Sequence, residues 1–302
     1  MRKSINIKII IFIISFLFLD QMCGITFGIL KTYARSGMYG KINYLKHPDT
    51  EILILGSSRA HHHYNSVLIG NQLKMKCYNA GMDGQSIYYS YLVGKKAINN
   101  SNVKLVILDV SPNIFADPLS EQKLKVLLPF RKEYPELLEI LSLHDKFAGI
   151  KSKFNLYNYN SKLLVILKGI NDKGDSLNYG FTPLNDISNS INIPISNNTF
   201  YDQYDHNKII YFEKLINQLS INNIKVAVVI SPMYAIDYNS KSDTPIFQEI
   251  CRKYQVSFFD FSMDSLFTGN KELFKDQLHL NGKGANIFSD KLSSLIRDKI
   301  PL

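Results

Sequence analysis

Five short apolar segments, each ended by a glycine, an asparagine or a serine, constrain the fold of this chain more than any other feature. They are Glu51–Leu55, Lys74–Tyr78, Val103–Val110, Ile224–Ile230 and Val256–Phe261. Runs of this length and composition are typical of strands that are buried on both faces of a sheet. Helical spacing of apolar residues lies between them, as in Tyr204–Leu219. This alternation predicts an α/β fold with three layers, α/β/α, around a mostly parallel sheet.

Composition excludes several classes of protein. The chain has 302 residues and 45% hydrophobic content, which is enough for a large core and excludes a disordered or fibrous protein. The net charge of +9 is spread along the chain without a basic block, so we expect no nucleic-acid partner. Cys23, Cys77 and Cys251 lack metal-ligand spacing, which argues against a disulfide scaffold and a zinc site. A pair between Cys77 and Cys251 stays open.

The N-terminus predicts a membrane anchor. The apolar run Ile9–Leu19 is too short to span a bilayer, which takes about 20 residues. Extension to Leu30 gives sufficient length, although it includes the ionisable Asp20. Because no Ala-x-Ala-like cleavage site follows, we favour an uncleaved anchor over a signal peptide or a buried core helix. Basic residues occur on both sides of the run, so charge contributes little to the orientation: they are Arg2, Lys3 and Lys8 before it and Lys31, Arg35 and Lys41 after it.

These features predict two parts of the chain. Residues 1–34 form the anchor and juxtamembrane segment, and residues 35–302 form the α/β domain. The domain would lie on the extracytoplasmic side of the cell membrane, held by a single membrane-spanning helix. Residues 116–202 break the strand–helix alternation and are rich in lysine, with helices expected near Gln122–Leu127 and Tyr134–Leu143. We interpret them as an insertion, either a lid over the substrate or a solvated basic surface.

Residues suited to nucleophilic catalysis lie near the two ends of the predicted domain. Gly56-Ser57-Ser58 follows the first strand, where α/β sheets place reactive groups and where a helix start offers free N–H groups. Asp276-Gln-Leu-His279 follows the last strand. A spacing of three lets the carboxylate orient the imidazole, which can then act as general base for a serine.

Possible oxyanion donors follow the intervening strands. Gly81 and Gly84 come after the second strand, and a glycine allows its backbone N–H to approach a substrate closely. Asn113 follows the third strand and carries a side-chain amide. A bare N–H and an amide N–H are the donor types that an oxyanion hole needs.

These four blocks resemble the SGNH/GDSL hydrolase superfamily, in particular its membrane-anchored members associated with envelope polysaccharide. The resemblance covers roughly residues 51–301. It implies Ser58 as nucleophile, with Ser57 as the runner-up, and Asp276 and His279 as its partners. It implies oxyanion donors at Ser58, Gly84 and Asn113, with Gly81 as the alternative glycine. Ser57 replaces the aspartate of Gly-Asp-Ser, and Ser111-Pro-Asn113-Ile replaces Gly-x-Asn-Asp.

The resemblance further implies a serine esterase that removes O-acyl, in particular O-acetyl, groups from a cell-surface or secreted glycan. An O-acyltransferase using the same residues, with a membrane-bound acyltransferase as partner, is one alternative. A non-catalytic glycan-binding protein is another. No cofactor is expected.

Arg59 and Tyr234 are further candidates for contact with substrate, although a salt bridge and a half-buried aromatic ring explain them equally well. A metal site at His61-His62-His63 is not expected, because consecutive helical residues point about 100° apart.

Overall fold

The computed structural model describes all residues except 1, 100–101, 116–122, 173–177, 186–203 and 235–242. The chain forms two compact units. The α/β unit comprises residues 44–124 and 174–302, and the helical unit comprises residues 1–43 and 125–173.

The α/β unit is built on a five-stranded sheet in the order β2-β1-β3-β4-β5, with every neighbouring pair parallel. The five predicted strands are all present, with shorter bounds: β1 (Ile52–Leu55), β2 (Cys77–Asn79), β3 (Leu105–Asp109), β4 (Lys225–Ile230) and β5 (Ser257–Asp260). The predicted α/β class and parallel sheet are therefore confirmed. The largest shift is at β2, which begins three residues after the predicted start at Lys74.

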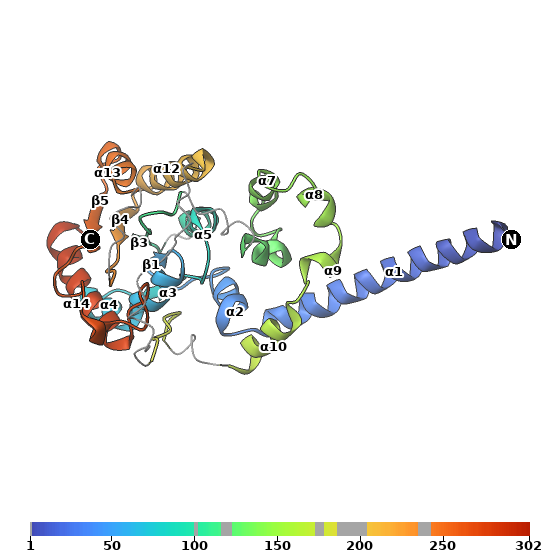
Figure 1. Ribbon diagram of the computed structural model, residues 1–302, viewed down its shortest axis with the longest axis horizontal. Coiled ribbons are helices and arrows are strands. Elements are labelled where there is room, and N and C mark those ends of the chain that lie inside the picture. Colours follow the sequence, from blue (N-terminus) through green and yellow to red (C-terminus); the bar gives the residue numbers. More distant parts are fainter. Residues whose placement is uncertain (1, 100–101, 116–122, 173–177, 186–203, 235–242) are drawn as a thin grey trace. The chain divides into compact units, whose positions relative to one another are not determined.

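Helices cover both faces of this sheet (Figure 1). They are α3 (Ser58–His63), α4 (Ser66–Leu73), α5 (Ile87–Ile98), α12 (His206–Ile221), α13 (Thr244–Lys253) and α14 (Gly282–Lys299), with a 3-10 turn at Lys271–Leu273. On one face, Ile54, Ile107 and Val229 of the strands form a core with Tyr64 and Phe288 of the helical layer.

The opposite face is covered by α5 and α12. A side chain at Gly94 would meet Leu55 of β1 and Leu215 of α12, so the absence of a Cβ lets the three elements pack closely. Alternate residues of each strand therefore serve two separate hydrophobic layers, as expected for a sheet buried on both faces. The expected three-layer arrangement is present.

The helical unit contains α1 (Arg2–Leu30), a 3-10 turn at Lys31–Tyr33, α2 (Gly37–Tyr44), a second 3-10 helix (Lys125–Phe130), α7 (Leu137–Ser142), α8 (Ala148–Lys151), α9 (Asn155–Asn158) and α10 (Leu163–Asn171). Among the residues that the structure describes, one helix, Asn6–Tyr33, is long and apolar enough to cross a membrane. The predicted helix at Tyr134–Leu143 is present as α7, whereas Lys125–Phe130 is a 3-10 helix containing Pro129.

The compact units divide the chain differently from the predicted domains. Residues 125–173 group with the N-terminal helix, not with the α/β unit. Of the predicted insertion 116–202, residues 178–185 belong to the α/β unit, and residues 116–122 and 186–202 lie outside the described residues. Cys77 and Cys251 are free and buried. They lie on β2 and α13, beside opposite edges of the sheet, so the pair considered for them does not form.

Candidate active site

The topology of the sheet locates the site. The chain passes from β1 to β2 in one direction and then to β3 on the other side of β1, so the strand order reverses between β1 and β3. Ligands of open α/β sheets bind at this switch point, outside the carboxyl ends of the strands. Ser58 follows β1, and Asn113 follows β3.

The turn after β1 presents Ser58 as the first residue of α3. Gly56 has φ +143° and lies so close to Ala60 and to the carbonyl of Asp109 that a Cβ would clash with both. Only glycine adopts this backbone readily. Because the first N–H groups of a helix have no intrahelical partner, the Ser58 N–H is available to a ligand.

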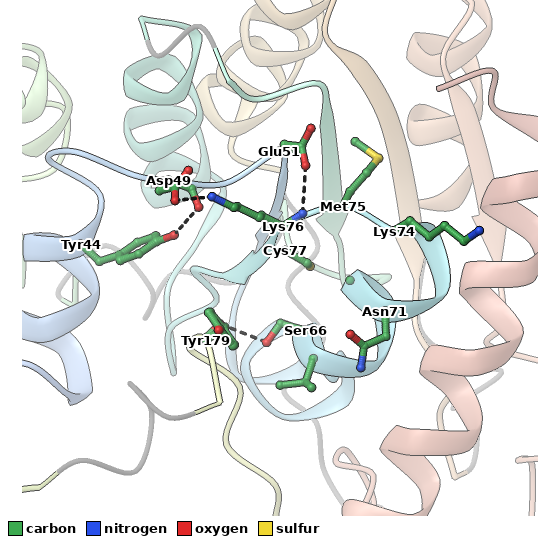
Figure 2. A pocket seen from close by; sticks show the side chains of 12 residues that line it. Tyr44, Asp49, Glu51, Ser66, Asn71, Lys74, Met75, Lys76, Cys77 and Tyr179 are labelled. Atoms are coloured by element: carbon green, nitrogen blue, oxygen red, sulfur yellow. Dashed lines mark hydrogen bonds and ion pairs between the residues drawn. The ribbon is translucent and has the colours of Figure 1, made fainter.

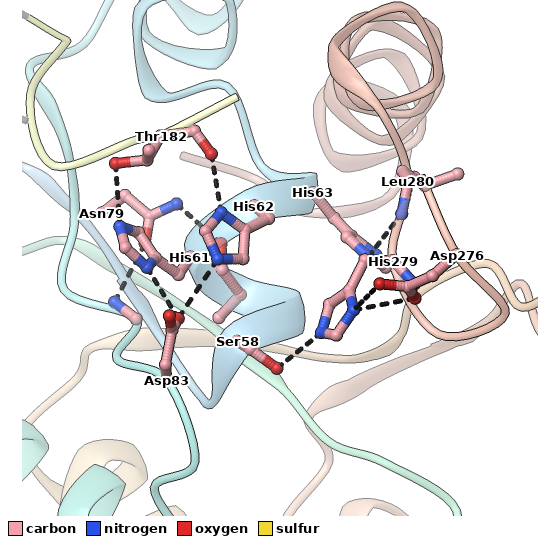
Figure 3. Close-up of polar contacts among 12 residues, drawn as sticks. Ser58, His61, His62, His63, Asn79, Asp83, Thr182, Asp276, His279 and Leu280 are labelled. Carbon is pink, nitrogen blue, oxygen red and sulfur yellow. Dashed lines mark hydrogen bonds and ion pairs between the residues drawn. The ribbon is translucent and has the colours of Figure 1, made fainter. Parts of the chain in front are cut away.

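Three residues that are distant in the sequence form a hydrogen-bonded chain (Figure 3). The Ser58 Oγ lies 2.8 Å from Nε2 of His279, and Nδ1 of His279 lies 2.9 and 3.0 Å from the two carboxylate oxygens of Asp276. Because Nδ1 must donate to the carboxylate, Nε2 carries the lone pair and accepts from the serine hydroxyl. This is the donor order that activates a serine as a nucleophile. The contact to His279 identifies Ser58, and not Ser57, as the bonded serine.

Local structure holds Asp276 and His279 in place. The Asp276 carboxylate also accepts the backbone N–H groups of Leu278 and His279, at 2.8 and 2.9 Å. Burial opposes ionisation of Asp276, but the hydrogen bonds from the His279 ring and these two N–H groups outweigh it and lower the pKa of the carboxyl. Asn281 then caps α14 by accepting the Gly284 N–H at 3.0 Å. The short Asp-x-x-His turn is thus held on one side by hydrogen bonds to the Asp276 carboxylate and on the other by the capped start of α14.

His63 is a supporting residue that sequence reasoning missed. It is fully buried, and its Nε2 accepts the N–H of Leu280, the residue after His279, at 3.0 Å. Its Nδ1 lies 3.0 Å from the hydroxyl of Ser231, at the end of β4. Burial, followed by the nearby charge of Arg59, holds the pKa of His63 well below its usual value of 6.5. His63 is therefore a neutral link between β4 and the loop that carries His279.

Arg59 and Tyr234 take structural positions. Arg59 is 6% exposed, and its guanidinium donates to the side chain and backbone carbonyl of Ser231. It is thus engaged within the protein, and a contact between Arg59 and substrate stays a prediction. Tyr234 is partly buried and packs edge-on against Phe274, with ring centroids 5.6 Å apart. This agrees with the half-buried aromatic alternative.

The two candidate glycines are distinguished by their surroundings. The Gly81 N–H donates to the side chain of Asn79 at 2.9 Å, and a Cβ at Gly81 would overlap the backbone of α3. Gly81 therefore serves close packing, and its N–H is occupied. Gly84 is partly exposed in the turn that follows, with φ +67°, and lies against the side chain of Lys123. Gly84 remains the glycine that is suited to donate to a ligand.

Asn113 is exposed in the turn after β3, where the Ile114 N–H donates to the carbonyl of Ser111. A buried carboxyl group supports this turn. Asp243 accepts the Phe115 N–H at 2.8 Å, and its own N–H donates to the Pro112 carbonyl. Burial raises the pKa of Asp243 to about 7. The Asp-Thr-Pro sequence that starts α13 was the available signal for this residue, since Asp and Pro are favoured at helix starts.

A second polar cluster adjoins the first. His61 and His62 stack at 4.3 Å between centroids and converge on the Asp83 carboxylate, at 2.8 and 3.2 Å (Figure 3). Consecutive histidines therefore do come together, because His61 uses Nδ1 and His62 uses Nε2. Burial opposes ionisation of Asp83, but hydrogen bonds from both rings hold the pKa of this carboxyl well below its usual value. Among the described residues, these three offer atoms spaced suitably for a metal ion.

Both rings are also held by Thr182. The other nitrogen of His61 lies 2.9 Å from the Thr182 hydroxyl, and Nδ1 of His62 donates to the Thr182 carbonyl at 2.7 Å. The edge of the His62 ring contacts His279, with centroids 5.9 Å apart. The cluster is therefore a direct neighbour of the Ser58–His279 pair.

A cavity of about 810 Å³ lies elsewhere in the α/β unit (Figure 2). It is bordered by residues at the amino ends of β1 and β2, including Glu51 and Lys76, whereas α/β sheets bind ligands at the carboxyl ends. Lys76 forms an exposed ion pair with Asp49 at its rim, at 2.6 Å. Ser58, Asp276 and His279 are not among the residues that line it. We therefore place the candidate site at the hydrogen-bonded chain.

Comparison with known proteins returns solved structures named as esterases and lipases. A protein assigned to the G-D-S-L lipolytic family from Desulfitobacterium hafniense matches with TM-score 0.43 and 10% identity, over 82% of this chain and 99% of its own. A GDSL-like lipase from Bacteroides thetaiotaomicron matches with TM-score 0.38 and 10% identity, over 82% and 88%. An acetyl xylan esterase from Butyrivibrio proteoclasticus matches with TM-score 0.38 and 9% identity, over 83% and 64%.

No protein-family model and no curated protein matches the chain. The solved structures carry names from the GDSL group, which is the superfamily that the four sequence blocks resemble.

Proposed function

We propose that the protein is a serine esterase that hydrolyses O-acyl esters through an acyl-serine intermediate. The observation that carries this proposal is the 2.8 Å contact between the Ser58 Oγ and Nε2 of His279, whose Nδ1 is bonded to Asp276. A hydroxyl, an imidazole and a carboxylate in this order have a direct chemical use, which is removal of the serine proton during attack on an ester.

The reaction would proceed in two halves. His279 takes the Ser58 proton as Oγ attacks the ester carbonyl, and the oxyanion accepts hydrogen bonds from the N–H groups of Ser58 and Gly84 and the amide of Asn113. The tetrahedral adduct then expels the alcohol, which receives the proton from His279. A water molecule next attacks the acyl-serine, with His279 again as base, and releases the carboxylic acid and free Ser58. Asp276 stabilises the imidazolium in both halves.

The proposed substrate is an O-acetylated glycan of the cell surface or a secreted polysaccharide. Support for this class is the resemblance to membrane-tethered members of the superfamily, which often modify such polymers. We also propose that α1 holds the protein in the cell membrane with the α/β unit outside the cytoplasm. The support for anchoring is the length and apolar character of Asn6–Tyr33.

The experiment is labelling of the purified full-length protein, in detergent, with a fluorophosphonate that reacts with activated serines. We expect one label at Ser58, lost in Ser58→Ala and retained in Ser57→Ala, which is the matched control one residue away. Peptide mapping identifies the site. A folded protein that takes up no label would contradict the proposal and favour the non-catalytic glycan-binding alternative.

Unlabelled protein from the same preparation would then be tested for acetate release from acetylated polysaccharides, with the labelled protein as the inactivated control. Release of acetate into water supports the esterase, whereas transfer of acetyl to an added sugar without free acetate would identify the acyltransferase alternative. Both reactions share the acyl-serine and differ only in the hydroxyl group that resolves it.

A further inference from the structure

The N-terminal helix is not free along its whole apolar length. Asp20 is 1% exposed, although it lies in the middle of α1. Its carboxylate accepts the backbone N–H and side-chain amide of Asn155, at 3.0 and 3.1 Å, and the Leu156 N–H at 2.8 Å. The start of α9 therefore satisfies the one carboxylate in the apolar stretch.

Further contacts extend this packing in both directions along α1. Phe16 lies beside Phe154, with ring centroids 6.1 Å apart, and Phe27 lies beside Tyr159 at 5.4 Å. A side chain at Gly24 would overlap that of Asn155, so glycine permits the close approach. Figure 1 shows α9 beside the C-terminal half of α1. The second half of α1 is therefore part of a packed helical unit.

The part of α1 before Asp20 is too short to span a bilayer. Residues 6–19 precede Asp20, and fourteen helical residues at 1.5 Å each measure about 21 Å. The hydrocarbon core of a bilayer is about 30 Å thick. If α1 spans the membrane, about 9 Å of the packed half must also enter it, together with the segments beside Asp20. Amphipathic segments at a membrane surface bury to about 5–10 Å, which matches this depth.

The start of α9 and the segments that flank it in the sequence carry the side chains that such a position needs. Large apolar side chains are exposed along α8, α9 and α10: Phe147 50%, Ile150 59%, Phe154 37%, Leu163 40%, Leu164 78%, Val165 40% and Leu167 38%. Exposed lysines alternate with them, namely Lys146, Lys153 and Lys168. Apolar side chains interleaved with lysines are typical of helices that lie at a lipid headgroup boundary.

We propose that residues 147–167 are seated in the headgroup region of the bilayer beside α1, with phospholipid as the occupant of their exposed apolar surface. The inference deepens the proposed anchor and rests on it. It also accounts for Asp20: a carboxylate at membrane depth is costly unless protein groups satisfy it, and α9 supplies three hydrogen bonds there. The anchor then consists of α1 and of residues 147–167, which lie beside it in one leaflet of the bilayer. We call residues 147–167 the collar.

The test uses the full chain in liposomes of phosphatidylcholine and phosphatidylglycerol, with one environment-sensitive bimane label at a time. Cys23→Ala removes the partly exposed cysteine, and the buried Cys77 and Cys251 remain. Labels are placed through Ile150→Cys and Leu164→Cys. Phe12→Cys, in the part of α1 before Asp20, reports on the anchor itself. Ile221→Cys, 69% exposed at the end of α12, is the solvent control of matched exposure.

We expect lipids that carry a shallow nitroxide to quench labels 150 and 164, a deep nitroxide to quench label 12, and neither to quench label 221. Quenching at 12 together with solvent-like behaviour at 150 and 164 would overturn the collar and leave the anchor standing. Solvent-like behaviour at 12 would overturn both. If labels 150 and 164 are unquenched in liposomes but shielded from solvent in native membranes, the occupant of this surface is a protein partner and not lipid.

Discussion

Two chains of carboxylate, imidazole and hydroxyl lie side by side around α3. One is Asp276–His279–Ser58, and the other is Asp83–His61–Thr182, with all imidazole contacts between 2.8 and 3.0 Å. Their hydrogen-bond geometry is nearly the same. If that geometry alone defined a nucleophile, the molecule would have two.

The surroundings of the two hydroxyl groups differ. Ser58 begins a helix, where backbone N–H groups are free for an oxyanion, and it lies at the switch point of the sheet. Thr182 lies outside any helix or strand; its N–H donates to the His61 carbonyl, and its own carbonyl accepts from His62. The backbone N–H and carbonyl of Thr182 are thus both already hydrogen-bonded within the protein. We therefore expect that donors for the developing charge, and not the Asp–His pair, distinguish a reactive hydroxyl from an unreactive one.

The largest effect should come from matched removal of the two imidazoles. We expect His279→Ala to lower kcat for a small acetyl ester by at least about a thousandfold, and His61→Ala to lower it by less than about threefold. Steady-state kinetics on folded variants measures both. Similar losses of kcat in the two variants would mean that the hydrogen-bonded group Asp83–His61–Thr182 also takes part in the chemistry.

The next effect tests the oxyanion donors. Asn113→Ala should reduce kcat by about a hundredfold with little change in KM, because an amide donor acts mainly on the charge that develops in the transition state. Thr182→Val, which deletes a hydroxyl from the second chain, is the comparison and should leave kcat nearly unchanged. A rise in KM alone after Asn113→Ala would assign that side chain to substrate binding instead.

A smaller effect concerns stability and pH. His63 is neutral when folded, whereas the unfolded chain gains a proton there below its usual pKa of 6.5. Stability should therefore be unaffected by this residue above pH 6.5 and should fall by up to about 1.4 kcal/mol per pH unit below it. Denaturant unfolding at several pH values measures the slope. His63→Gln should reduce the slope of the unfolding free energy against pH by the amount that corresponds to one bound proton. The same change at the exposed His47, His47→Gln, should not.

The smallest expected effect is that of metal removal. His61, His62 and Asp83 hold one another and Thr182 by hydrogen bonds, and the proposed mechanism uses none of them. Dialysis against EDTA should leave kcat unchanged within error. Activity that is lost on dialysis and restored by Zn²⁺ in the wild type, but not in His61→Ala, would identify this cluster as a metal site. The two hydrogen-bonded groups would then differ in metal binding as well.

Much of the fold could be predicted because its signals are local. The five apolar runs are all strands, since a strand buried on both faces needs consecutive apolar residues. Ser58 and the Asp276–His279 turn were identifiable because each lies at the end of an element and because spacing of three suffices for the carboxylate to reach the ring. The grouping of residues 125–173 with the N-terminal helix was not predicted, since nothing local indicates that Asn155 and Leu156 bind Asp20, some 135 residues away.

Local sequence was sufficient to predict the strand–helix alternation, the apolar N-terminal helix and the residue types that suit ester chemistry, because periodicity and turn chemistry act over a few residues. Tertiary structure alone decided which serine meets His279, 221 residues along the chain, and which glycine keeps its N–H free. It also decided that Arg59 is buried against Ser231 and that neighbouring histidines converge on Asp83. These outcomes depend on contacts between distant segments, which exist only once the layers have packed.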